Sequence, residues 1–139
     1  MTWLCTYCSR DKSHVGGLLP AIERYHSARI ASVNAAATAL GVRFCILSGE
    51  YGLISPDTPI RDYDHRLTGD EIPVLARTVA RQLGELGITR LVFVTRPLRV
   101  DPGAAPYGEV LTMAAATCSV PVCTIELPGA RGTNACPDG

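Results

Sequence analysis

The sequence predicts an α/β protein with a mainly parallel sheet of about four strands and helices on both faces. Short apolar runs alternate along the chain with stretches of helical periodicity, which is the pattern of such folds. The run over residues 91–95 is continuously apolar, as in a strand buried on both faces of a parallel sheet. A content of 47% hydrophobic against 19% charged residues is sufficient for a packed core.

The predicted elements follow one another in a single domain. With 139 residues the chain has the size of one domain, so we expect an α/β domain over 1–127 and a mobile tail over 128–139. The strands are predicted at residues 2–8, 42–47, 91–95 and 120–125. The helices are predicted at residues 21–40, 71–86 and 107–117. Pro20 suits a first helical turn, Gly41 and Gly87 suit helix ends, and Thr68 or Asp70 suits a cap.

This order of elements places the ligand site at one edge of the sheet. Ligands of parallel α/β sheets bind beyond the carboxyl ends of the strands. We therefore expect the loops after Cys8, Leu47 and Thr95 to converge there. The 22 residues from Ser48 to Gly69 are predicted as one long loop, and loops of that length are usually functional.

The loop after the first strand begins with Cys8-Ser9-Arg10-Asp11-Lys12. A thiol near Arg10 and Lys12 has its thiolate favoured and becomes a better nucleophile. Ser9 and the loop amides are suited to hold an anion or a carbonyl oxygen. The alternative is that Cys8 is a small buried core residue and the charges are solvated.

The long loop carries a second set of candidate residues. They are Ser48, Gly49, Glu50, Tyr51, Tyr63 and Asp64. Small residues let the backbone approach a ligand, and the flat rings of Tyr51 and Tyr63 suit stacking on a base. Asp64 or Glu50 suits a general base or a partner for exocyclic amines. The alternative is an ordered surface loop whose tyrosines close the core.

Composition and missing motifs exclude several classes of function. Thirteen basic and 13 acidic residues balance, which argues against non-specific nucleic-acid binding by the whole protein. We find no signal peptide and no apolar run of membrane length, so we expect a cytoplasmic protein with reduced cysteines. Cys5 and Cys8 have metal-ligand spacing but lack a second pair, so we predict no metal site. No standard cofactor motif occurs, and we predict no cofactor.

Four short motifs together resemble a known family. They are Cys8-Ser9-x-x-Lys12, Tyr25-x-Ser27, the run from Ile46 to Pro56, and Ile60-x-x-Tyr63-Asp64. In these motifs the chain resembles the DUF6884 group of small bacterial and phage domains and, more broadly, the peroxide-stress protein YaaA superfamily. The cysteine-lysine and tyrosine-serine motifs are also similar to the core domain of archaeosine synthase, which attaches lysine to a deazaguanine base of transfer RNA.

The resemblance implies a pocket for a nucleobase-like ligand. We expect Cys8, Lys12 and Asp64 to be catalytic. The expected substrate contacts are Ser9, Arg10, Tyr25, Ser27, Ser48, Gly49, Glu50, Tyr51 and Tyr63. No oligomeric state is predicted.

Three hypotheses of function follow. The first is an enzyme acting on a nucleobase, nucleoside or nucleotide. It cleaves an N-glycosidic bond with Asp64 or Glu50 activating water, or it transfers a group to the base with Cys8 as nucleophile and Lys12 stabilising the adduct. The second is a non-catalytic stress-response module that binds a nucleotide or DNA in the same pocket. The third is an interaction domain without a small ligand.

Overall fold

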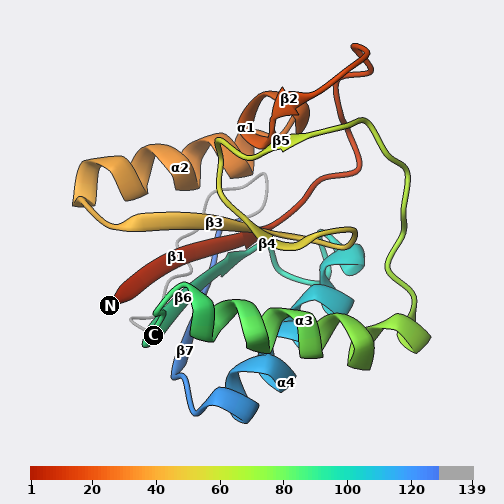
Figure 1. Ribbon diagram of the computed structural model, residues 1–139. Coiled ribbons are helices and arrows are strands. Elements are labelled where there is room, and N and C mark those ends of the chain that lie inside the picture. The colour runs from red at the N-terminus through yellow and green to blue at the C-terminus, as the bar shows by residue number, and fades with distance from the viewer. Residues whose placement is uncertain (129–139) are drawn as a thin grey trace.

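The computed structural model describes residues 1–128, and their central feature is a five-stranded sheet (Figure 1). In spatial order its strands are β4 (Gly52–Ile54), β3 (Arg43–Ser48), β1 (Thr2–Tyr7), β6 (Arg90–Thr95) and β7 (Val122–Glu126). The pairs β3–β1, β1–β6 and β6–β7 are parallel, and β4 is antiparallel to β3. The predicted α/β class with a mainly parallel sheet is therefore confirmed.

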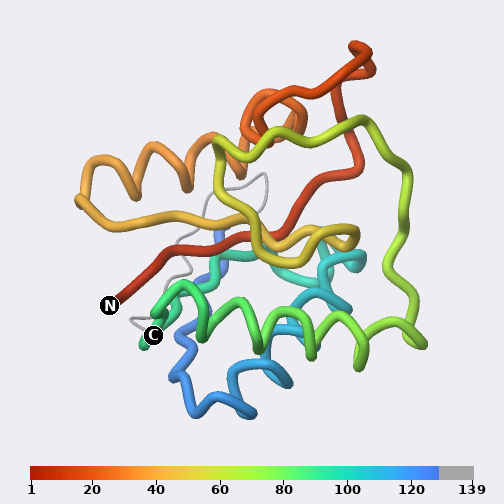
Figure 2. Tube along the Cα trace, viewed as in Figure 1, coloured from red at the N-terminus to blue at the C-terminus, as the bar shows by residue number. Residues whose placement is uncertain are grey.

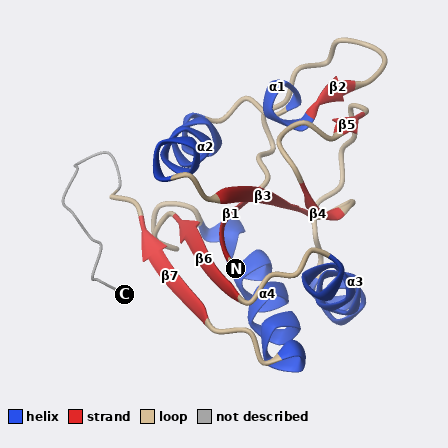
Figure 3. Ribbon diagram, turned by 60° about the vertical axis from the view of Figure 1, so that its left-hand side comes forward, coloured by secondary structure: helices blue, strands red, loops and turns tan. Residues whose placement is uncertain are grey.

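Helices cover both faces of the sheet. They are α1 (Ala21–Arg24), α2 (Ala28–Leu40), α3 (Ile72–Glu85) and α4 (Ala105–Cys118). Helix α2 covers one face, and α3 and α4 pack against each other on the opposite face (Figure 3). Among the residues described, no helix has both the length and the apolar character needed to cross a bilayer.

Alternation along β1 divides the core into two halves, because successive side chains of a strand point to opposite faces. Leu4 and Cys8 pack on the side of α2, whereas Cys5 and Tyr7 pack on the side of α3 and α4. The Cys5-x2-Cys8 spacing therefore places the two thiols on opposite faces, where they cannot hold one metal ion.

The order of the parallel strands locates the point where ligands bind in sheets of this kind. The chain first crosses from β1 to β3 on one side, and later enters β6 on the other side of β1. The connections thus change direction beside β1, and ligands of doubly wound sheets lie at this switch point, outside the carboxyl ends of the strands. The residue that follows β1 is Cys8.

The helix predicted over 21–40 is interrupted, which corrects that prediction. Tyr25 adopts an extended backbone (φ −84°, ψ 123°) and ends α1, and Ser27 starts α2 by accepting the Ile30 amide. Between the two helices Tyr25 forms an isolated antiparallel bridge with Lys12. Apolar periodicity continues across the break, so periodicity alone predicts one helix where the N-cap serine begins a second.

The segment predicted as a loop over 48–69 also contains regular structure. It includes β4, and β5 (Pro59–Ile60), which pairs with β2 (Leu19–Pro20). The Gln82 side chain accepts the Leu53 amide and donates to the carbonyls of Tyr51 and Leu53, so α3 holds the strand in place.

Beyond β5 the chain runs without strand or helix to the short 3-10 turn η1 (Gly69–Glu71), as the trace in Figure 2 shows. Thr68 and Glu71 form a capping box at this turn, as the predicted cap at Thr68 implies. The second short turn, η2 (Pro102–Ala104), precedes α4. Of the tail predicted to be mobile, residues 129–139 lie outside the described residues.

Candidate functional site

Cys8 lies at the carboxyl end of β1, and the backbone around it is held on two sides. Its amide donates to the Leu47 carbonyl of β3 at 2.9 Å. Its carbonyl accepts a hydrogen bond from the buried Arg29 guanidinium at 3.2 Å. The side chain is 9% exposed, and its thiol donates to the Tyr107 hydroxyl, with 3.5 Å between Sγ and Oη. The thiol is thus placed at the switch point, close to the surface.

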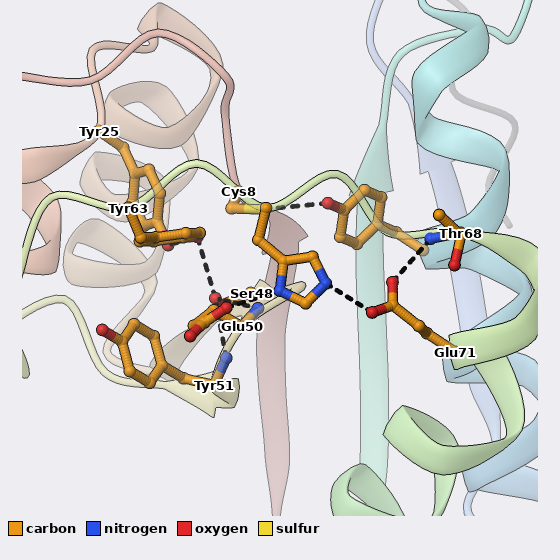
Figure 4. Close-up of polar contacts among 10 residues, drawn as sticks. Cys8, Tyr25, Ser48, Glu50, Tyr51, Tyr63, Thr68 and Glu71 are labelled. Atoms are coloured by element: carbon orange, nitrogen blue, oxygen red, sulfur yellow. Dashed lines mark hydrogen bonds and ion pairs between the residues drawn. The ribbon is translucent and has the colours of Figure 1, made fainter.

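A chain of hydroxyl groups starts at Ser48, the last residue of β3. Its Oγ accepts the amides of Glu50 and Tyr51 at 3.0 and 3.1 Å. The same oxygen is 3.0 Å from the Tyr63 hydroxyl, which is 2.5 Å from the Tyr25 hydroxyl. Figure 4 shows Tyr25 and Tyr63 next to Cys8. A serine of β3, a tyrosine between two helices and a tyrosine of the long loop thus meet beside the thiol.

Lys12 is the only lysine of the chain, since the other 12 of its 13 basic residues are arginines. Its Nζ lies 4.4 Å from the centre of the Tyr63 ring and 5.8 Å from that of Tyr25. An ammonium group over an aromatic face is stabilised by the ring's negative π-surface. One face of Tyr63 is therefore occupied by the ammonium, and the ring also meets Tyr51 at a steep angle, with 5.6 Å between the ring centroids.

The phenols around the thiol stay protonated. Burial, and then the negative charge of a Cys8 thiolate, raise the pKa of Tyr25, Tyr63 and Tyr107. A protonated phenol can donate a hydrogen bond at any physiological pH. Tyr107 occupies the first turn of α4, and a Cβ atom at Gly49 would lie only 3.1 Å from its Oη. Gly49 therefore leaves the space that the Tyr107 hydroxyl needs beside Cys8.

His65 links two carboxylates next to this cluster. Its Nδ1 is 2.6 Å from Glu50 and its Nε2 is 2.8 Å from Glu71 (Figure 4 shows both carboxylates). Hydrogen bonds to Glu50 and then to Glu71 raise the pKa of His65. The Thr68 amide and then His65 lower the pKa of Glu71. The three groups tie the turn after β3, the long loop and the start of α3 together.

This arrangement predicts a pH-dependent contribution to stability. The raised pKa of His65 means that its contribution is fully present below 6.5 and is lost as the pH rises through the higher folded-state value. The lowered pKa of Glu71 means that its contribution is lost as the pH falls below about 4.5. His65→Gln is therefore expected to cost more free energy of unfolding at pH 5.5 than at pH 9.

Urea unfolding of wild type and His65→Gln at both pH values measures this difference. His14→Gln is the control, because it removes a histidine that pairs with a carboxylate, Asp62, at an exposed position. Equal losses of free energy of unfolding for His65→Gln at the two pH values would show that folding does not raise the pKa of the imidazole.

The remaining predicted residues are divided between the cluster and the surface. The Ser9 hydroxyl donates to the Asp11 carbonyl, Arg10 is exposed, and Ser27 caps α2. Asp64 is exposed and has no hydrogen-bond partner among residues 1–128. The Glu50 carboxylate is bound to His65. The structure therefore brings Cys8, Lys12, Tyr25, Ser48, Tyr51 and Tyr63 together, whereas the Glu50 carboxylate is held by His65 and Asp64 is exposed.

Sequence reasoning missed Tyr107, His65 and Arg29. Arg29 is 6% exposed and donates to Thr6 Oγ1 and to the Tyr7 carbonyl at 2.6 Å each, which fixes the end of β1. The signal for Tyr107 was its position in the first turn of the helix after a parallel strand, where side chains face the carboxyl edge of the sheet. No sequence spacing signals His65 or Arg29, because their partners are distant along the chain.

Two hollows lie away from this cluster. One of about 520 Å³ lies between α4 and strands β6 and β7, and its lining contains no cysteine, histidine, lysine or tyrosine. Another of about 450 Å³ lies beside α2 and the start of β3. Of these three places, only the Cys8 cluster brings a thiol, an ammonium group and several phenol hydroxyls together. In the described part of the chain, no group of three or more His, Cys, Asp or Glu residues is arranged to hold a metal ion.

The fold and this cluster define an α/β protein of the doubly wound class with a thiol at the carboxyl end of its central strand. Comparison of the chain with models of protein families, with curated proteins and with solved structures found no match.

Proposed function

We propose that this protein is an enzyme that acts on a nucleobase, nucleoside or nucleotide by group transfer to the base, with Cys8 as the nucleophile. The observation that carries the proposal is the convergence of the Cys8 thiol, the Lys12 ammonium and the hydroxyls of Tyr25 and Tyr107 at the switch point of the sheet. The resemblance of the motifs around Cys8 and Ser48 to the archaeosine-synthase core supports a base as the substrate.

The transfer is a displacement in two halves. In the first, a bond forms between Cys8 Sγ and an electrophilic carbon, and the leaving group departs with its electron pair and takes the thiol proton. In the second, a nucleophilic acceptor forms a bond to that carbon, the C–S bond breaks, and the acceptor's proton returns to sulfur. Lys12 stabilises the negative charge that develops on the substrate in both halves. Tyr51 is available to stack on the base.

The second version of the predicted chemistry, cleavage of an N-glycosidic bond, has less support. It needs a carboxylate that activates water beside the sugar. The Glu50 carboxylate is hydrogen-bonded to His65, and the exposed Asp64 makes no hydrogen bond to a residue of the cluster. We therefore favour group transfer through the thiol.

A thermal-shift screen tests the proposal. The panel contains nucleobases, nucleosides, nucleotides, deazaguanines and, as a comparison class, amino acids. A ligand at 100 times its Kd stabilises the folded state by about 2.7 kcal/mol, which raises Tm by several degrees in a domain of this size. We expect a hit that is lost in Lys12→Ala and kept in Arg77→Ala.

Arg77→Ala is the matched control because Arg77 is an exposed cation on α3, so its removal changes the net charge equally. A hit that survives Lys12→Ala would place the ligand elsewhere, for example in the hollow beside β7. A screen without any hit would count against the base as substrate and favour an interaction domain.

A further inference from the structure

The hydroxyl chain at the candidate site contains one proton without an acceptor. Ser48 Oγ accepts two backbone amides, which occupy both of its lone pairs, so its own proton is directed to Tyr63. The chain from Ser48 through Tyr63 to Tyr25 then has three hydroxyl protons and only two hydroxyl–hydroxyl hydrogen bonds. One phenolic proton therefore has no partner among residues 1–128.

The free proton is assigned to Tyr25. The Tyr63 oxygen already accepts a hydrogen bond from Ser48. If each phenol oxygen accepts only one hydroxyl proton, Tyr63 must donate its own proton to Tyr25, at 2.5 Å. The Tyr25 proton must then point to a group outside the chain of hydroxyls. Tyr25 is only 3% exposed, so bulk water reaches this hydroxyl poorly, and a buried donor without an acceptor is costly.

The second polar group at this place is also a donor. Lys12 carries three N–H donors and no acceptor, and among the described residues its only hydrogen bond is a long one of 3.4 Å to the Arg10 carbonyl. Its Nζ lies near both the Tyr25 and Tyr63 rings. Tyr25 and Cys8 belong to the same core cluster, on the side of α2 (Figure 4).

We infer that the ligand atom seated beside Cys8 is a hydrogen-bond acceptor, held by the Tyr25 hydroxyl and the Lys12 ammonium, and that the site selects bases with an oxo group over their amino analogues. An oxo oxygen accepts both hydrogen bonds, whereas an exocyclic amine would present a donor to two donors. The inference rests on the proposed function in one respect, that the ligand is a base; the pair of donors beside the thiol does not depend on it.

The first experiment tests the donors without any base. Acrylamide adds to Cys8 with negative charge developing on its carbonyl oxygen, whereas methyl methanethiosulfonate reacts by displacement at sulfur and places no charge on a carbonyl. Rates at Cys8 are measured by mass spectrometry, with fragment ions separating Cys8 from Cys5. We expect Tyr25→Phe to slow the acrylamide reaction about tenfold, equivalent to about 1.4 kcal/mol. The thiosulfonate reaction should change less than about twofold.

Two further variants make the result specific. Tyr63→Phe removes the group that orients the Tyr25 proton, so it is expected to slow the acrylamide reaction by a smaller factor than Tyr25→Phe. Tyr7→Phe is the matched control, since it removes a phenol hydroxyl next to Cys8 in sequence that donates to Asp101 and not to the chain of hydroxyls. An equal effect of Tyr25→Phe on both reagents would overturn the inference.

The second experiment tests the selectivity for bases. Binding of inosine against adenosine, and of uridine against cytidine, compares an oxo group with an amine at the same ring position; the neighbouring ring nitrogen changes from an N–H donor to an acceptor together with it. We expect the wild type to bind the oxo member about tenfold more tightly and Tyr25→Phe to lose the preference, since one hydrogen bond to a partner of this kind is worth about that factor. Preference for the amino members would overturn the inference. Absence of binding to all four, with the reagent result as expected, would refute the base as substrate and keep the donor pair.

Discussion

Replacing Cys8 by serine is expected to reduce turnover of a base-containing substrate about 10³-fold or more while the fold is retained. Removal of the nucleophile from a covalent mechanism typically has an effect of at least this size on kcat. A hydroxyl without an adjacent base is a much weaker nucleophile than a thiol at neutral pH. The loss should appear in kcat more than in KM, because Lys12 and Tyr51 remain to bind the substrate.

The fold should tolerate the change because the backbone of residue 8 is held independently of its side chain. The amide of Cys8 donates to Leu47 and its carbonyl accepts from Arg29. A serine hydroxyl can also keep the hydrogen bond to Tyr107. Urea unfolding should therefore give a free energy of unfolding within about 1 kcal/mol of the wild-type value, since one neutral hydrogen bond contributes about that amount.

Steady-state kinetics with the substrate found in the screen measure the effect. Cys118→Ser is the matched control, because Cys118 is an exposed cysteine at the end of α4, away from the cluster. Full turnover by Cys8→Ser would refute the covalent mechanism. It would favour the alternative in which Asp64 or Glu50 activates water.

The largest effect on stability is expected for Arg24→Met, which should lower the free energy of unfolding by about 3 kcal/mol. Arg24 is completely buried, and its guanidinium donates to four backbone carbonyls. Those carbonyls belong to Ser13, Val15, Gly17 and Ile60. A methionine fills the volume but leaves acceptors unpaired, and each buried unpaired group costs about 1–3 kcal/mol. Partial access of water to the exposed residues 14–17 limits the total.

Urea unfolding at constant pH measures this loss, with a second measurement that reports on the site. Arg24 precedes Tyr25 and holds the loop that follows Lys12 against β5, so Arg24→Met should also increase proteolysis near residues 13–17. Arg81→Met is the control: Arg81 forms an exposed pair with Glu85, and such pairs contribute about 0–1 kcal/mol. Equal losses of free energy of unfolding for Arg24→Met and Arg81→Met would show that the buried guanidinium does not order the loop.

Local patterns determined the class of fold. The apolar runs at 44–47 and 91–94 lie in strands because residues buried on both faces of a sheet must be apolar, a property visible in one segment at a time. The alternation of strands and helices then implies parallel pairing and a site at the carboxyl edge. Cys8 and Ser48 were predicted at that edge for this reason, and both lie at the ends of adjacent strands.

Where the sequence pattern did not distinguish helix or strand from loop, tertiary contacts decided the secondary structure. The apolar periodicity of 21–40 continues through Tyr25, but the bridge to Lys12 and the cap at Ser27 break the helix there. The three residues of β4 are too few to be told from loop by composition. They form a strand because β3 offers a free edge and because Gln82 of α3 binds their backbone.

The same distinction holds for the site. The sequence by itself determined which loops approach one another and supplied a thiol, an ammonium and tyrosines on them. Only the tertiary structure decided that Glu50 is bound by His65 while Asp64 faces solvent, and that Tyr25 and Tyr63 share one hydrogen bond beside the thiol. These pairings join residues far apart in the chain, and hydrogen bonding depends on distances of a few tenths of an ångström, which no spacing of residues encodes.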